Sequence, residues 1–597
     1  MLLGRRRKAA RMIQYRIDVA EPAAHRFQVT LTVERPDADC VLALPVWIPG
    51  SYMVREFSRH VSGLQARQGS AQRPVVALDK TTWRVACTGR AALVLRYEVY
   101  AFDPSVRCAY LDDERGFFNP TSLCLSVRGR EGVPHALRIA QLPRGWDVAT
   151  AMPPAEPAAH GPAHSYLCAD YDELADHPVE LGRFWRGSFE AGGVAHELVV
   201  SGAWPRFDAQ RLLADTQRIC TAQIAFWHGA DATPDAVPFQ RYVFLLNVVE
   251  DGYGGLEHRA STALIANRRD LPRQGQPETS EGYQTLLGLI SHEYFHTWNV
   301  KRLKPLEFGR YDYSRENYTE LLWFFEGFTS YYDDLFLRRI GLMSVDRYLR
   351  ALGRTLNAVA STPGQRVQSV AEASFDAWVK YYRPDENSLN VTVSYYAKGS
   401  LLAWLLDMRL RTAGTGTLDD LMRTLWQRHA TTGLCETDVL DAVREQAGPP
   451  LADELAHWIH ARAELPLAPA LAVMGLHTPT EAPTKTSWAT RWGLKLSESG
   501  GSVVVKGVLR GSCAEAAGVS AGDEILAVDG WRVRRLEDAR QWVAPDAACE
   551  WLVGRGQRVR RLTFDPTQGT AIQPVSLTLQ TGLDDTTRAR RSAWLGE

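Results

Sequence analysis

Two histidines stand four residues apart, with a glutamate after the first, in the segment GLISHEYFHTWNVKRLKP (residues 288–305). On a helix, residues i and i+4 project from the same face, so the imidazoles of His292 and His296 can both reach one metal ion. Glu293 is then placed to act on a bound water rather than on the metal. Zinc lowers the pKa of such a water to about 7, and Glu293 would take its proton during attack on a carbonyl. The spacing therefore predicts one catalytic Zn2+, with Glu293 as the general base.

The third protein ligand of the predicted zinc is expected among the glutamates downstream. A catalytic zinc usually takes three protein ligands and leaves one position open. Glu326 is preferred, because it lies within the aromatic segment LWFFEGFTSYYDD, where an unpaired carboxylate would be costly. Glu320, nearly two turns earlier, is the alternative, and Glu307 and Glu316 are further candidates. Asp333, two turns after Glu326, either supports a ligand or is an ordinary solvated aspartate.

The five residues HEYFH would also fit an ordinary surface helix that carries two histidines. The residues before the motif help to decide between these interpretations. Leu286, Leu287, Leu289 and Ile290 form an apolar approach to the motif, which favours a buried helix. We therefore expect a buried zinc-binding helix.

The elements that would position this helix change from β structure to helices along the chain. Residues 13–178 contain short segments rich in Val, Leu, Tyr and Phe, which predict an N-terminal β domain. They are QYRIDVA, RFQVTLTVE, VLALPVWI, WRVACTG, ALVLRYEVYAF and LCLSVRG. Residues 179–470 begin with mixed strands and helices and continue with long helical segments, which predicts an α+β domain whose C-terminal half is mostly helical. The expected fold class is multidomain α+β.

The two ends of the chain and one connecting stretch have their own composition. Residues 1–12 are basic and lack the apolar core of a secretory signal, so we expect a disordered tail. Residues 471–488 are rich in Pro, Ala and Thr, as linkers often are. Residues 489–597 contain short strands around a small helix and are expected to form a separate C-terminal module.

The overall composition argues against several function classes. The 68 Lys+Arg residues balance 69 Asp+Glu, which gives no electrostatic reason to expect a nucleic acid partner. No apolar run reaches the roughly 18 residues of a membrane span. The nine cysteines are scattered, without a CxxC pair, so neither a disulfide framework nor a cysteine zinc site is expected. We expect a cytoplasmic protein, with a periplasmic location as the alternative.

Three further segments resemble the aminopeptidase N branch of the gluzincin metallopeptidases. They are GGLEH (residues 254–258), WFFEGF after HExxH, and YAKG (residues 396–399). The first resembles a signature whose glutamate binds the free α-amine of the substrate, which implies that Glu257, with Gly254 and Gly255, binds substrate. The last resembles a signature whose tyrosine hydrogen-bonds the tetrahedral intermediate, which implies a catalytic role for Tyr396.

The whole chain looks closer to the PDZ-containing glycyl aminopeptidases, metallopeptidase family sixty-one. WIPGSYMVREF (residues 47–57) resembles that family's N-terminal signature. The order of β domain, thermolysin-like zinc peptidase domain (179–470) and PDZ domain (489–597, with a C-terminal tail) also matches. There are two departures. The spacing from His296 to Glu326 is longer than in aminopeptidase N, and Leu256 and His258 stand where the amine signature has Met and Asn.

Physical arguments accompany these two implied roles. A strand followed by a Gly-rich turn precedes GGLEH, and an edge strand beside the zinc helix could pair with an extended peptide. Glu257 at its end would meet an ammonium group and restrict cleavage to the first residue; a surface glutamate after a turn is the simpler alternative. Tyr396 would donate a hydrogen bond to charge that develops on the carbonyl oxygen. Its alternative is a packing tyrosine, and the side chain of its neighbour Tyr395 is expected to point away.

The C-terminal module resembles a bacterial-type PDZ domain, through WGLKL (residues 492–496) and AGVSAGDEILAVDG. The resemblance implies a carboxylate-binding loop in which backbone N–H groups capture a chain terminus. The residues of this predicted loop are Gly493, Leu494, Lys495 and Leu496. A structural cap on the enzyme is the alternative role of the module.

Together these observations predict a zinc aminopeptidase that removes small N-terminal residues, with glycine foremost and alanine next. The preference for glycine comes only from the family resemblance. The expected partners are peptides with a free N-terminus and a C-terminal peptide at the PDZ domain, without nucleic acid. One alternative is a PDZ-guided zinc endopeptidase in which Glu257 does not bind an amine. Another is a non-catalytic adaptor that binds peptides.

Overall fold

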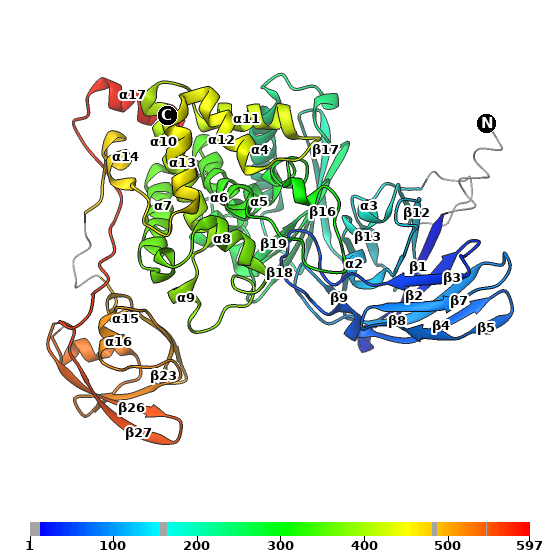
Figure 1. Cartoon of the computed structure of the whole chain (residues 1–597), viewed down its shortest axis with the longest axis horizontal. Coiled ribbons are helices and arrows are strands. Elements are labelled where there is room, and N and C mark those ends of the chain that lie inside the picture. The colour runs from blue at the N-terminus through cyan, green and yellow to red at the C-terminus, as the bar shows by residue number, and fades with distance from the viewer. Residues whose placement is uncertain (1–11, 156–163, 480–485, 545, 597) are drawn as a thin grey trace. The chain divides into compact units, whose positions relative to one another are not determined.

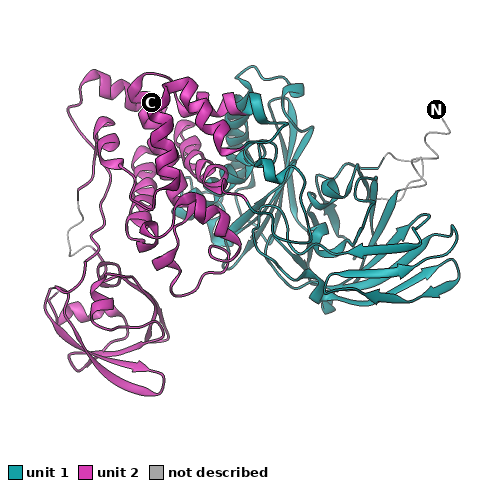
Figure 2. Cartoon of the chain, in the orientation of Figure 1, with its two compact units in different colours: residues 1–318, 426–434 teal, residues 319–425, 435–597 magenta. Residues whose placement is uncertain are grey.

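The computed structural model describes residues 12–155, 164–479, 486–544 and 546–596, and the chain divides into two compact units (Figure 2). The first unit comprises the chain up to Tyr318 together with residues 426–434. The second comprises residues 319–425 and 435–597. Residues 1–11 of the predicted basic tail lie outside the described residues.

The N-terminal β domain belongs to the first unit and contains three sheets (Figure 1, blue to cyan). Alternate residues of its first two strands are buried, as the two-residue period of a strand with one face on a core requires. The first sheet has the spatial order β14 (Ser165–Cys168), β12 (His135–Ala140), β1 (Ile13–Glu21), β2 (Arg26–Val33), β8 (Leu93–Tyr100), β4 (Val61–Gln68) and β5 (Ala71–Arg73). The second has the order β13 (Asp147–Ala149), β15 (Val179–Gly182), β10 (Arg115–Phe118) and β9 (Ala109–Leu111). The third has the order β11 (Ser126–Val127), β3 (Asp39–Ala43), β7 (Thr82–Ala86) and β6 (Val75–Ala77).

Two details of the β domain differ from the sequence-based expectation. The domain does not end at residue 178, because β15 pairs with β10 and β13 and so belongs to it. The segment LCLSVRG is not one strand. Pro120 starts a short helix, α2 (Pro120–Leu123), since proline is favourable at the first helical position, and only Ser126–Val127 of the segment pair as a strand.

A five-stranded mixed sheet completes the first unit. Its order is β16 (Trp185–Ala191), β17 (Val194–Ser201), β18 (Arg241–Val249), β20 (Ser261–Asn267) and β19 (Gly254–Glu257). β18 runs parallel to β17 and β20 and is almost entirely apolar and buried, as a central parallel strand should be. β19 runs antiparallel to β20 at the end of the sheet. The helices α4 (Ala209–His228) and α5 (Glu281–Phe295) belong to the same unit, and α5 contacts β19.

The second unit begins with helices, of which α6 (Leu322–Arg339) and α10 (Tyr395–Ala413) pack closely together. Two glycines lie at this contact, since a Cβ added to Gly327 would stand 2.5 Å from the Cα of Gly399. Glycine inside a helix costs about 1 kcal/mol relative to alanine, so both positions are explained by the close approach rather than by helix propensity. The neighbouring helices are α7 (Val345–Ala360), α8 (Val370–Phe375), α9 (Ser388–Val391), α12 (Glu436–Ala447), α13 (Pro449–His460) and α14 (Leu467–Val473).

The predicted PDZ module has its own sheet and its own hydrophobic core, which contains Trp492, Trp551 and Phe564. The sheet order is β22 (Leu494–Ser499), β23 (Ser502–Val508), β24 (Glu524–Val528), β26 (Cys549–Arg555) and β27 (Arg558–Phe564), with β25 (Trp531–Arg532) paired to β24. The predicted linker at 471–488 is wrong in part. It contains the end of α14, the short strand β21 (Leu476–His477) and the start of α15 (Trp488–Arg491), while residues 480–485 lie outside the described part of the chain.

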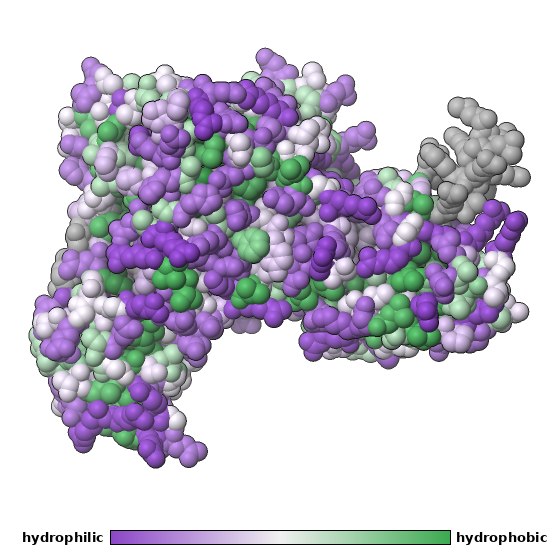
Figure 3. Space-filling model, viewed as in Figure 1, coloured by the Kyte–Doolittle hydropathy of each residue, from purple (hydrophilic) through white to green (hydrophobic). Residues whose placement is uncertain are grey.

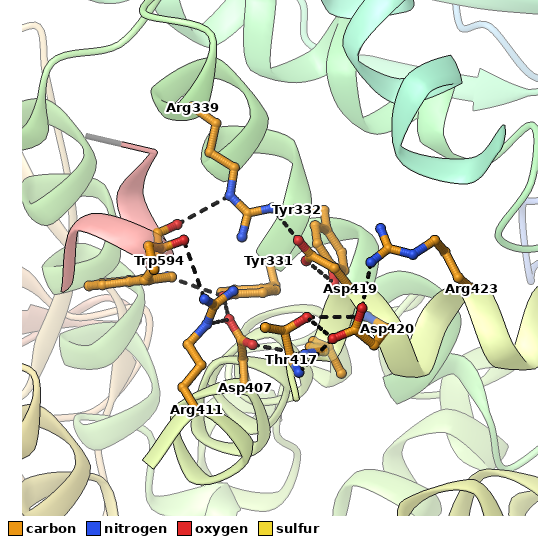
Figure 4. A network of polar contacts seen from close by, with 12 residues as sticks. Tyr331, Tyr332, Arg339, Asp407, Arg411, Thr417, Asp419, Asp420, Arg423 and Trp594 are labelled. Atoms are coloured by element: carbon orange, nitrogen blue, oxygen red, sulfur yellow. Dashed lines mark hydrogen bonds and ion pairs between the residues drawn. The ribbon is translucent and has the colours of Figure 1, made fainter. Parts of the chain in front are cut away.

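The C-terminal segment leaves this module and returns to the helices of the second unit. β28 (Thr578–Leu579) pairs with β21, and α17 (Asp585–Leu595) contacts α6. The buried indole of Trp594 donates a hydrogen bond to the Tyr331 hydroxyl at 3.2 Å, and Tyr331 donates to Asp407 at 2.6 Å (Figure 4). Arg339 donates to the backbone carbonyl of Trp594 at 3.2 Å. The predicted PDZ tail is therefore a structural part of the helical region.

The surface in the view of Figure 3 is largely hydrophilic, and its hydrophobic residues form small separate patches. Among the helices that the structure describes, none combines the length and the apolar character that crossing a bilayer requires.

Candidate active site

The predicted zinc-binding helix is α5. Ser280 caps its start by accepting a hydrogen bond from the backbone N–H of Tyr283 at 3.0 Å. His292 lies in its last turn, and His296 caps its end with backbone angles that are still helical. The Nε2 atoms of the two histidines are 3.0 Å apart. Two imidazoles bound to one tetrahedral zinc at the usual bond length would have these atoms about 3.3 Å apart, so the pair is arranged to share an ion.

The segment after α5 orients the ring of His296. Its Nδ1 atom is 2.8 Å from the backbone carbonyl oxygen of Asn299. Because a carbonyl oxygen can only accept, Nδ1 carries the proton and Nε2 keeps its lone pair for a metal. The next residue, Val300, has φ 122°, which is a strained value for a β-branched residue. The turn that orients His296 must therefore be stabilised by its surroundings.

Glu326 lies near the start of α6 and is 2% exposed. His292, His296 and Glu326 form a group in which one ligand atom of each residue lies within 4.8 Å of the others. Two imidazoles and one carboxylate are a donor set that catalytic zinc takes in proteins, so the residues fit the predicted ion. The group found within the described ranges does not include the other candidates, Glu307, Glu316, Glu320 and Asp333.

Tyr396 lies in the first turn of α10, which the contact between Gly327 and Gly399 brings close to α6. Burial, followed by the negative charge of Glu326, raises the pKa of Tyr396 well above its ordinary value. Its hydroxyl therefore remains protonated at neutral pH and can donate a hydrogen bond.

The expectation that Tyr395 points away from Tyr396 is wrong. At the start of α10 their rings stack with centroids 4.8 Å apart, because both rings pack against that of Tyr381, which precedes the helix. Tyr395 is fully buried, whereas Tyr396 is partly exposed. Of the two rings, that of Tyr396 is therefore the more exposed.

The edge strand β19 lies against the zinc-binding helix at Glu293. A Cβ added to Gly255 would overlap the Glu293 carboxylate, so only glycine leaves room for that side chain. Gly254, with φ 152°, also has a backbone conformation that other residues rarely adopt. Because alternate residues of a strand share a face, Glu257 projects from the same side of β19 that meets Glu293. The predicted base and the predicted amine anchor thus lie on one side of the edge strand.

Glu257 is only 4% exposed. Its carboxylate lies against Gly50, which is in the segment WIPGSYMVREF. Leu256 is buried in a core cluster on the opposite face of the strand. His258 follows the strand and has its Nδ1 atom 3.3 Å from Asp176. The two departures from the amine signature therefore concern residues whose own side chains contact a core cluster and Asp176.

The predicted carboxylate loop of the PDZ module is partly committed to contacts within the module. The N–H of Gly493 donates to the carbonyl of Thr490 at 3.2 Å, and its carbonyl accepts from Leu509 at 2.8 Å. Leu494 is buried, Leu496 is half-buried and Lys495 is exposed. Peptide capture by residues 493–496 remains a prediction.

Sequence reasoning missed several residues that shape this region. No recognisable short-range pattern marks Gly50, Asp176 or Lys301. Gly50 meets Glu257, and Asp176 meets His258 and Lys301, from distant parts of the chain. A signal did exist for Gly327 and Gly399, since a glycine inside a strongly helical pattern usually has a packing reason.

Three segments of the chain match known protein families. Residues 14–183 match the M61 peptidase N-terminal domain, residues 285–402 match the M61 glycyl aminopeptidase, and residues 504–553 match a PDZ domain. Comparison with curated proteins yields no match.

Solved structures provide a match over the whole chain. An aminopeptidase N family protein from Idiomarina loihiensis is 36% identical with a TM-score of 0.90, and the match covers 98% of this chain and 100% of that one. An M1 zinc metallopeptidase from Deinococcus radiodurans is 14% identical, with 77% and 95% covered and a TM-score of 0.47. Aminopeptidase A from Legionella pneumophila in complex with aspartic acid is 11% identical, with 94% and 58% covered and a TM-score of 0.47. The last two are too distant to support an assignment.

From the family matches and the first structure, the chain belongs to the M61 glycyl aminopeptidase family and is a metallo-aminopeptidase.

Proposed function

We propose that the protein is a zinc aminopeptidase that releases small N-terminal residues, glycine first and alanine next, from peptides. The observation that carries this proposal is the position of Glu257 and Glu293 on one side of the edge strand β19. A peptide that pairs with this edge in extended form would present its ammonium group to Glu257. Its first peptide bond would then lie beside Glu293.

We propose that His292, His296 and Glu326 hold one zinc ion. When bound there, zinc polarises a substrate carbonyl and lowers the pKa of a bound water to about 7. Glu293 accepts the proton of the attacking water at its carboxylate and delivers it to the leaving amine.

Two further side chains act on the substrate in this proposal. The Tyr396 hydroxyl donates a hydrogen bond to the carbonyl oxygen as negative charge develops on it. Glu257 forms an ion pair with the α-ammonium group, and this contact restricts cleavage to the first residue.

The preference for a small first residue is supported by the family and by the contact between Gly50 and Glu257. Because the β domain reaches the Glu257 carboxylate directly, we propose that it limits the space beside the first residue of a bound peptide. We also propose that the PDZ module receives a C-terminal peptide. We further propose that the protein is cytoplasmic, because its nine cysteines are free thiols and eight of them are buried.

A panel of p-nitroanilides of glycine, alanine and leucine, each free and N-acetylated, tests the proposal. We expect cleavage in the order glycine, alanine, leucine, no cleavage of the acetylated forms, and loss of activity with a chelator. Glu293→Gln should abolish hydrolysis while zinc per chain stays unchanged, and Glu320→Gln, an exposed glutamate outside the metal group, should remain active.

Each alternative function has a distinct outcome in the same panel. Equal cleavage of acetylated and free substrates would point to an endopeptidase. A purified protein without bound zinc and without activity would point to a peptide-binding adaptor.

A further inference from the structure

Asp176 is a buried carboxylate of the N-terminal β domain, directly after the short helix α3 (Tyr171–Ala175). It meets two segments that are distant in sequence. Its Oδ1 atom is 2.7 Å from the Lys301 Nζ and 3.3 Å from the His258 Nδ1. Its Oδ2 atom accepts a hydrogen bond from the backbone N–H of Arg259 at 2.9 Å. The Lys301 side chain is only 3% exposed, so this ion pair is shielded from water.

The contacts with His258 and Arg259 hold the end of the edge strand β19. Both residues follow Glu257 directly, in the turn where the His258 N–H donates to the Ser261 carbonyl at 2.9 Å. The Arg259 guanidinium also forms an ion pair with Asp172, the fourth residue before Asp176. The backbone from which Glu257 projects is therefore tethered to the β domain from both Asp172 and Asp176.

The contact with Lys301 holds the segment that follows the zinc-binding helix. The backbone N–H of Lys301 donates to the carbonyl of His296 at 3.1 Å. Lys301 directly follows Val300, the strained residue of the turn that orients the His296 ring. The ion pair with Asp176 thus stabilises a conformation that the backbone alone disfavours.

Asp176 is charged in this environment. Burial opposes the charge, but Lys301 and then Arg259 overcome it and hold the pKa of Asp176 well below its usual range. Removing the carboxylate would leave Lys301 buried without its counter-charge, which is more costly than never burying the pair.

We propose that Asp176 is a positioning residue that fixes the separation between Glu257 and the zinc-binding helix, and so makes the enzyme cut after the first residue. The inference rests on the proposed function and deepens it. One carboxylate reaches both the strand that presents the amine anchor and the turn that orients a metal ligand. Shifting it would change the distance between the ammonium site and the metal without removing either.

Asp176→Asn tests this inference through a split between KM and kcat that simple destabilisation would not produce. For free glycine p-nitroanilide we expect KM to rise about tenfold and kcat to change far less. The reason is that a misplaced amine anchor weakens substrate binding more than it slows the chemical step. With the detection limit taken as the rate for the N-acetylated form, the advantage of the free substrate in kcat/KM should shrink by a similar factor, and zinc per chain should stay unchanged. Asp18→Asn is the matched control, because Asp18 is also buried and paired with an arginine, Arg16, in β1. Unchanged KM and unchanged selectivity in zinc-loaded Asp176→Asn would overturn the inference.

A second variant covers the case in which Asp176→Asn does not fold. The double change Asp176→Asn with Lys301→Met removes both charges and avoids an unpaired buried lysine. It should show the same loss of selectivity, and wild-type selectivity in the double variant would also overturn the inference. Failure of the proposed function looks different, because the unaltered enzyme would then cut acetylated and free substrates equally.

Discussion

The carboxylate of Glu257 lies directly against the backbone of Gly50. A Cβ added to Gly50 would stand 2.5 Å from both carboxylate oxygens, and Gly50 has φ 89°. Gly50 belongs to the segment WIPGSYMVREF of the β domain, whereas Glu257 ends the edge strand of the following sheet. The β domain is thus part of the region where a substrate amine is proposed to bind, and the glycine of its motif has a steric reason.

Gly50→Ala should displace the Glu257 carboxylate and weaken binding of free-amine substrates. We expect KM for glycine p-nitroanilide to rise about tenfold, with zinc per chain unchanged. Gly63→Ala is the matched control, because Gly63 also has a positive φ, 62°, but open space around its Cβ position. Equal effects of the two changes would mean that backbone strain, rather than contact with Glu257, is responsible.

Gly255→Ala should lower kcat rather than raise KM. The new methyl group would overlap the Glu293 carboxylate and move the proposed base. We expect a loss in kcat of about a hundredfold, the size that general-base catalysis contributes, while the metal remains bound. The control is Gly132→Ala, which meets no atom within 4 Å. Full activity of Gly255→Ala would show that Glu293 is not constrained by β19.

Gly399→Ala should weaken metal binding. Its Cβ would stand 2.6 Å from the Trp323 carbonyl oxygen and 2.9 Å from the Gly327 Cα, so α6 and α10 must separate. Because Glu326 lies beside Gly327, we expect the zinc dissociation constant to rise about tenfold or more, as for changes around metal ligands. Gly353→Ala, where the Cβ position has only ordinary contacts at 3.8 Å, should bind zinc normally. A chelator competition assay measures both.

His196 should make the protein sensitive to acid. Its Nδ1 lies 2.9 Å from the Val194 carbonyl and its Nε2 lies 2.8 Å from the Tyr294 hydroxyl of α5. Burial lowers the pKa of His196 from 6.5 to about 4. The unfolded chain therefore binds more protons than the folded one between these values, so stability is lost as the pH falls from about 6.5 to 4.

The variant His196→Gln isolates this effect. Every other group titrates in both proteins, so the difference between their urea unfolding curves at pH 7 and pH 4 reports on His196 alone. We expect the unaltered protein to lose up to about 3 kcal/mol more than the variant over this range. Parallel pH profiles would show that His196 contributes nothing.

Trp594→Ala should destabilise the helical part of the second unit. Trp594 is fully buried, and its indole donates to Tyr331 on the helix that carries Glu326 (Figure 4). Removing a buried tryptophan costs about 3–5 kcal/mol. Trp531→Ala is the control, since Trp531 is 66% exposed, and chemical denaturation measures both. Equal stability of the two variants would mean that α17 is not a structural part of this region.

Features that depend on local spacing can be predicted from the amino-acid sequence. HExxH on an apolar segment predicts the helix α5 and the common direction of His292 and His296, because four residues make about one helical turn. Alternation of apolar and polar residues predicts strands such as β1 and β2, and an aromatic segment around one glutamate singles out Glu326. These patterns need no knowledge of how distant parts of the chain meet.

Contacts between distant segments become visible only in the folded chain. Gly50 against Glu257, Asp176 against Lys301, and Trp594 against Tyr331 join residues more than a hundred positions apart. The same is true of β15 joining the β domain and of the C-terminal segment returning to β21. Such contacts follow from shape complementarity and charge pairing in the folded chain, and a single sequence carries no periodic signal for them.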